Sequence, residues 1–150
     1  MGKTDTLTGS ASGRDEKDVT ENRRSARILY VEDNYQNMRL VRKILNHAGY
    51  EMLEAEDGLT ALEVVASESM DLILLDINLP DIDGLEVLAR IRENPALQAL
   101  PIIALTANAM VGDREKMLAA GCSDYLPKPI SRQELLDMVA QYLAKPSADK

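Results

Sequence analysis

The chain has 150 residues and a formal net charge of −8, which is enough length for one ordinary domain and too little for two. That much negative charge argues against a nucleic-acid-binding surface, because phosphate contacts need a basic face, and it suits a protein that binds cations or basic partners. One cysteine, Cys122, excludes an internal disulfide, and no run approaches the roughly eighteen apolar residues of a membrane span.

The first 26 residues are polar and carry five acids and five bases, so the net charge belongs to the rest of the chain. They have hardly any periodic apolar residues and cannot bury enough surface to offset the entropy lost on ordering. We therefore predict a disordered tail over 1–26, one ordered domain over 27–143 and a short second tail over 144–150.

Strands and helices alternate between these tails. Short apolar or alternating runs predict strands at 28–31, 50–55, 72–75, 101–105 and 123–126. Helical spacing and terminal signals predict a helix after each strand: from Asn34 to Gly49, after an Asp57-Gly58 turn, from Asp83-Gly84 to Asn94-Pro95, over about 111–120, and from a Ser131/Glu134 capping box to 143. The alternation predicts an α/β fold, flavodoxin-like and doubly wound, with a five-stranded parallel sheet in the order 2-1-3-4-5 flanked by five helices.

The strand at 72–75 organises the rest of the chain. Its four apolar residues lead directly into Asp76, and Pro80 prevents the strand from continuing. With the order 2-1-3-4-5, the first and third strands are neighbours at the point where the strand order reverses, which is where ligands bind in such sheets. Glu32 and Asp33, which follow the first strand, would then converge with Asp76 in one shallow pocket.

Three adjacent carboxylates repel one another unless a cation offsets their charge. Mg²⁺ suits a site with few carboxylates and several waters. Lys128, after the fifth strand, adds a second positive charge, and Thr106, at the end of the fourth, can donate a hydrogen bond. A carboxylate beside Mg²⁺ and an ammonium is well placed to attack a phosphoryl group, so the predicted chemistry is phosphoryl transfer onto Asp76.

With these residues the sequence resembles a known family, the receiver domains of bacterial two-component response regulators. It is most similar to receiver domains of the single-domain or hybrid-kinase type. The resemblance covers about 27–143. It is carried by ILYVEDN at 28–34, LLDINLP at 74–80 with DGL at 83–85, IALTA at 103–107 and YLPKP at 125–129. Two departures are Tyr30, which is larger than the usual aliphatic residue, and Ile130, where Phe is common.

The resemblance implies a phosphorylation site built around a cation. Asp76 would be the phosphorylated aspartate. Glu32 and Asp33 would be the metal-binding acidic pair, with Asp33 the direct ligand. The backbone carbonyl of Asn78 would complete the protein ligands of Mg²⁺. Asp81 and Asp83 depart from the family pattern as acids beyond its standard loop, and we expect them to strengthen cation attraction.

The resemblance also implies a switch. Thr106 would be the switch hydroxyl, Lys128 the phosphate-binding lysine and Tyr125 the switch aromatic, which turns inward on phosphorylation. Asn78 and Asn108 would tune the rate at which water removes the phosphate. The Lys128–Pro129 peptide bond would be cis.

The expected phosphoryl donor is a histidine kinase or histidine phosphotransfer protein, and the expected recipient of the signal is a downstream protein target. The surface formed by 111–120, the last strand and the last helix would change its partner preference. We expect a cytoplasmic phosphoacceptor rather than an enzyme, with no direct contact to nucleic acid or membrane. A homodimer through the last helix stays open, and so does the choice between a stand-alone protein, which the bare C-terminus favours, and a domain of a larger regulator.

Three alternatives fit the sequence less well. The run Asp81-Ile82-Asp83-Gly84 resembles the Asp-x-Asp motif of haloacid-dehalogenase-type phosphatases, but there the motif directly follows the buried strand, where this chain has Asp76. A calcium loop starting at Asp76 is excluded by Pro80 at its fifth position. A degenerate receiver acting as a scaffold requires a missing site residue, and none is missing.

Overall fold

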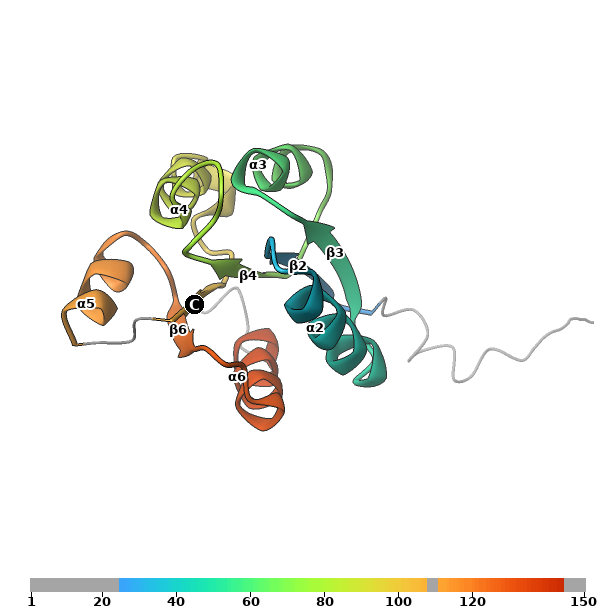
Figure 1. Cartoon of the computed structure of the whole chain (residues 1–150). Coiled ribbons are helices and arrows are strands. Elements are labelled where there is room, and N and C mark those ends of the chain that lie inside the picture. The colour runs from blue at the N-terminus through green and yellow to red at the C-terminus, as the bar shows by residue number, and fades with distance from the viewer. Residues whose placement is uncertain (1–24, 108–110, 145–150) are drawn as a thin grey trace, which may run out of the picture.

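The computed structural model of the chain describes residues 25–107 and 111–144, and within these ranges strands and helices alternate as predicted (Figure 1). The strands are β2 (Arg27–Val31), β3 (Glu51–Ala55), β4 (Leu72–Asp76), β5 (Ile102–Thr106) and β6 (Asp124–Pro127). The helices are α2 (Tyr35–His47), α3 (Gly58–Ser67), α4 (Gly84–Arg92), α5 (Val111–Ala119) and α6 (Arg132–Ala144), with a short 3₁₀ helix η2 (Pro95–Leu97) after α4. Of the two predicted tails, only residues 25, 26 and 144 lie within the described ranges.

The strands form one parallel sheet in the order β3-β2-β4-β5-β6. Counted along the chain this is 2-1-3-4-5, so the predicted doubly wound topology is confirmed. β2 and β4 are neighbours although α2, β3 and α3 separate them in sequence, and Val31 pairs with Leu75 in their register. The residues that follow Val31 in one chain segment and Leu75 in the other therefore emerge side by side at the carboxyl edge of the sheet.

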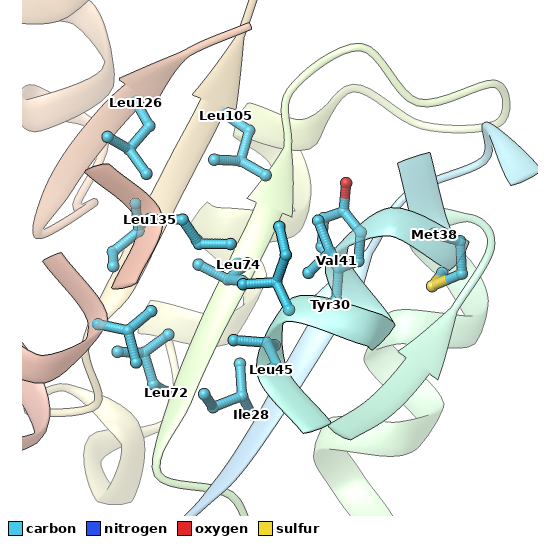
Figure 2. Packing of buried hydrophobic residues seen from close by; sticks show 13 residues of the cluster. Ile28, Tyr30, Met38, Val41, Leu45, Leu72, Leu74, Leu105, Leu126 and Leu135 are labelled. Carbon is cyan, nitrogen blue, oxygen red and sulfur yellow. The ribbon is translucent and has the colours of Figure 1, made fainter. Parts of the chain in front are cut away.

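Helices cover both faces of the sheet. α2 and α6 pack against one face, and α3, α4 and α5 pack against the other. Figure 1 shows α3 and α4 above the sheet and α2 and α6 below it. β4 lies between the two layers, and because successive strand residues point to opposite faces, Leu72 and Leu74 enter the α2–α6 layer (Figure 2) while Ile73 and Leu75 enter the other. All four are fully buried, as expected for a central strand.

One local prediction needs correction, and another is confirmed but incomplete. Asp57, predicted as part of a turn, is the N-cap of α3, because its carboxylate accepts a hydrogen bond from the Thr60 N–H at 2.8 Å. Asn94-Pro95, predicted only to end α4, also begins η2, since proline is well tolerated in the first turn of a helix. Among the described helices, none is long and apolar enough to cross a membrane.

Candidate functional site

The carboxyl edge of the sheet holds the buried polar residues of the core. Asp76 is the last residue of β4, Thr106 is the last residue of β5, and Glu32 directly follows β2. Their exposed fractions are 1%, 4% and 1%, and they are the buried polar or charged residues within the described ranges. Three polar groups, which ordinarily favour contact with water, are thus brought together beneath the surface by the ends of the strands.

The acids converge as the strand order requires. Carboxylate oxygens of Glu32, Asp33 and Asp76 lie within 4.8 Å of one another. Glu32 and Asp76 are buried, whereas Asp33 is exposed. The structure therefore brings together the three acids that the sequence selected.

Lys128 completes the charge balance. Its Nζ lies 3.1 Å from Oδ2 of Asp76 and 3.2 Å from Oε1 of Glu32. The backbone fixes its place, since the Lys128 N–H donates to the Thr106 carbonyl at 2.8 Å, and the next peptide bond, to Pro129, is cis as predicted. One ammonium therefore bridges two buried carboxylates.

Tyr30 belongs to the site, and sequence reasoning missed it by noting only its size. Its hydroxyl donates to Oε1 of Glu32 at 2.7 Å, and the Asn34 N–H donates to Oε2 at 3.2 Å. The available signal was the spacing, because residues two apart in a strand project from the same face.

The electrostatics separate the two buried acids. Burial raises the pKa of Asp76 to about 6, and the charge of Glu32 adds to this, although the N–H of Asn78 and the ammonium of Lys128 work in the opposite direction. Burial also acts to raise the pKa of Glu32, but hydrogen bonds from Tyr30 and Asn34, with the charge of Lys128, lower it overall. Of the two, Asp76 therefore has the higher proton affinity.

The same environment keeps the donors protonated. Burial raises the pKa of Tyr30 far above its usual value, and the neighbouring Glu32 adds to that shift. Burial lowers the pKa of Lys128, but the carboxylates of Asp76 and Glu32 outweigh it and raise the pKa overall. Both groups stay hydrogen-bond donors at neutral pH.

The remaining predicted residues are placed as follows. The N–H of Asn78 donates to Oδ1 of Asp76 at 3.0 Å. Tyr125 lies half-buried in β6, with the Arg114 guanidinium of α5 centred 5.8 Å from its ring. Asn108 lies outside the described residues.

Asp81 and Asp83 lie outside the acidic cluster of Glu32, Asp33 and Asp76, and their effect on cation attraction stays a prediction. Asp81 accepts hydrogen bonds from the N–H groups of Gly58 at 2.8 Å and Leu59 at 2.9 Å, and Asp83 accepts one from the Leu85 N–H at 3.0 Å. Both acids cap helices, where unpaired N–H groups and the helix dipole favour a negative charge.

The donor set suits Mg²⁺. Three carboxylates supply only oxygen ligands, which hard divalent cations prefer, and the exposed position of Asp33 leaves one side of the set open to water. The repulsion among these acids, which Lys128 offsets only in part, is the reason a cation would be attracted.

Known proteins similar to this chain are response regulators and receiver domains. A family model described as the response regulator receiver domain matches residues 28–140. The polar-differentiation response regulator DivK of Brucella anthropi is 40% identical over 116 residues, which cover 77% of this chain and 94% of that protein.

Solved structures show the same likeness. The receiver domain of the sensor histidine kinase PA1611 from Pseudomonas aeruginosa PAO1, which has a magnesium ion coordinated in its active-site cleft, is 39% identical with a TM-score of 0.75, over 81% of this chain and 99% of that one. The chemotaxis response regulator CheY4 of Vibrio cholerae is 29% identical with a TM-score of 0.76, over 79% and 98%.

Proposed function

Because this chain belongs to the response regulator receiver domain family, we propose that it is a phosphorylation switch whose Asp76 accepts a phosphoryl group from a phosphohistidine. The observation that carries this proposal is the buried Asp76 carboxylate, bridged to Glu32 by Lys128 and grouped with Asp33. This arrangement combines a nucleophile at the end of β4, a cation-binding acid pair after β2 and a positive charge after β6.

The transfer uses the side chains already in contact. A carboxylate oxygen of Asp76 forms a bond to phosphorus while the bond from phosphorus to the donor imidazole nitrogen breaks, and the bonding electron pair stays on that nitrogen. Lys128, 3.1 Å from Asp76, is close enough to follow the charge as it moves onto the phosphoryl oxygens.

The metal of the proposal is Mg²⁺, held by Glu32, Asp33, Asp76 and the backbone carbonyl of Asn78. When bound, it neutralises charge on the phosphoryl oxygens during transfer. The acidic cluster supports this choice, and so does the magnesium ion in the similar PA1611 receiver domain.

The switch runs from Asp76 to the face of the domain formed by β6 and α6. A phosphoryl group adds negative charge and acceptor oxygens beside Thr106, which lies on the neighbouring strand β5. Thr106 moves to donate to one of these oxygens, and the ring of Tyr125 turns into the space that it leaves. Tyr125 lines a shallow groove between α5, β6 and α6, so its movement alters the surface that a downstream protein contacts.

We propose a switch rather than an enzyme with a separate substrate. The phosphoryl group ends on Asp76 of the domain itself, and the site assists its own phosphorylation and dephosphorylation. The donor would be a histidine kinase or a histidine phosphotransfer protein in the cytoplasm, and the recipient of the signal would be another protein.

The experiment that tests this proposal uses phosphoramidate, whose phosphorus–nitrogen bond resembles that of phosphohistidine. The protein is treated with phosphoramidate and Mg²⁺, then with borohydride, which reduces an aspartyl phosphate to homoserine. Peptide mass analysis is expected to find homoserine at position 76. Homoserine at another aspartate, with Asp76 unchanged, would overturn the assignment.

A further inference from the structure

We infer that Tyr30 is a positioning residue for magnesium binding, which acts through the carboxylate of Glu32. The inference rests on the cation site of the proposed function. Tyr30 is not among the site residues predicted from the sequence.

The tyrosine hydroxyl is held in place by the fold. The ring of Tyr30 is fully buried, in the hydrophobic cluster that also contains Val41 and Leu45 of α2. Figure 2 shows its hydroxyl oxygen at the end of the ring that points out of this hydrophobic cluster. Tyr30 and Glu32 are two residues apart, so β2 directs both side chains to one face and the hydroxyl meets Oε1 at 2.7 Å. A ring with two torsions, packed on every side, is a rigid donor.

Glu32 needs such a donor. A glutamate side chain has one more torsion than an aspartate, and an ionised carboxylate that is 1% exposed must be hydrogen-bonded to keep its charge. Oε1 accepts from Tyr30 and lies 3.2 Å from Lys128, while Oε2 accepts from the Asn34 N–H. These contacts fix the carboxylate in one orientation beside Asp33 and Asp76.

The three donors are not equivalent during the proposed reaction. Lys128 is shared with Asp76 and turns toward the phosphoryl group when it arrives. The Asn34 N–H binds the other oxygen. Tyr30 is therefore the donor that keeps Oε1 of Glu32 in place throughout, with no charge of its own to repel the cation.

If Tyr30 served packing alone, removal of its hydroxyl would change the affinity for Mg²⁺ very little. Tyr30→Phe keeps the ring and removes the hydrogen bond, so it separates the two roles. The matched control is Tyr142→Phe, because the Tyr142 hydroxyl donates to the Ser123 carbonyl at 3.0 Å and to Asp124 at 2.9 Å, at the opposite edge of the sheet.

The readout is the dissociation constant for Mg²⁺, measured by calorimetric titration of the unphosphorylated protein. We expect Tyr30→Phe to weaken binding by about tenfold, as the loss of a hydrogen bond to a charged group implies, and Tyr142→Phe to leave it unchanged. The same titration is made in a Glu32→Asp background, where the shorter side chain cannot reach the hydroxyl. There Tyr30→Phe is expected to change binding by less than about twofold.

The outcomes divide clearly. Equal Mg²⁺ affinity for Tyr30→Phe and the unmodified protein would overturn the inference and leave the proposed cation site intact. An equal loss in both backgrounds would also overturn it, since the effect would not pass through Glu32. No Mg²⁺ binding by the unmodified protein at millimolar concentration would overturn the cation site itself. Circular dichroism of each variant confirms that it is folded before titration.

Discussion

The ammonium of Lys128 lies 3.1 Å from Oδ2 of Asp76, across 52 residues of sequence. The contact joins the end of the central strand β4 to the segment after the edge strand β6, and β5 lies between those strands. The same ammonium lies 3.2 Å from Glu32. One lysine therefore offsets the charge of two buried acids. A net negative charge remains in the site, and the repulsion between its acids lowers the stability of the folded protein.

Asp76→Asn is expected to stabilise the metal-free protein at neutral pH. Burial raises the pKa of Asp76 to about 6 from an ordinary 3.8, so the folded state binds the proton more tightly than the unfolded state. Stability contributed by this group is thus lost as the pH rises from about 4 to 6. Removing the charge should recover about 1–3 kcal/mol at pH 7.5 and nothing below about pH 4. Urea unfolding of both proteins in EDTA between pH 4 and 8 measures the difference; a constant difference at all pH values would contradict this origin.

Mg²⁺ is expected to stabilise the unmodified protein against heat. A ligand that binds only the folded state at ten times its dissociation constant adds about 1.4 kcal/mol, or a few degrees in Tm for a domain of this size. Asp33→Asn should abolish the shift, because Asp33 is one of the three acids of the cluster and the one exposed to solvent. Glu63→Gln removes an exposed acid on α3 and serves as the control. A shift that survives in Asp33→Asn would show that the cation binds elsewhere.

Thr106→Ala is expected to separate phosphorylation from switching. The substitution leaves Asp76, Lys128 and the acid pair in place, so beryllofluoride, an analogue of the phosphoryl group, should still bind. Amide signals of β6 and α6 in a ¹H–¹⁵N spectrum should then shift much less than in the unmodified protein, because the hydroxyl that joins the two regions is gone. Full shifts in the variant would remove Thr106 from the switch.

Gly84→Ala is expected to cost more than about 2 kcal/mol of unfolding free energy. A Cβ on Gly84 would lie 2.6 Å from the Cα of Ile77 and 2.7 Å from the carbonyl oxygen of Asp76, so the backbone next to the proposed phosphorylation site would have to move. Gly49→Ala is the comparison: Gly49 has φ +94 and open space around it, so only backbone strain of about 1 kcal/mol is expected. Equal losses in urea unfolding would show that the loop adapts freely.

Much of the fold followed from local patterns in the sequence. Four apolar residues before Asp76 marked a strand buried on both faces, and alternation with helices required parallel pairing, which together bring Glu32 next to Asp76. The caps at Asn34 and Asp83 were visible as residue types. The site could be assembled because its parts sit at strand ends, whose relative positions the topology sets.

What sequence reasoning missed depends on side-chain reach. Asp81 binds the start of α3, 22 and 23 residues away, and nothing in its own neighbourhood indicates that partner. Tyr30 was noted only for its bulk, because a strand pattern shows which face a side chain occupies but not whether its far end meets a donor or an acceptor. Such contacts are properties of packing and appear only when the layers are assembled.

The central claim is tested most directly by intact mass after incubation with acetyl phosphate, for the unmodified protein and for Asp76→Asn. The account predicts one added phosphate on the unmodified protein, none when Mg²⁺ is replaced by EDTA, and none on the variant in either condition. A phosphate that appears equally on Asp76→Asn, or that is added in full without a divalent cation, would contradict it.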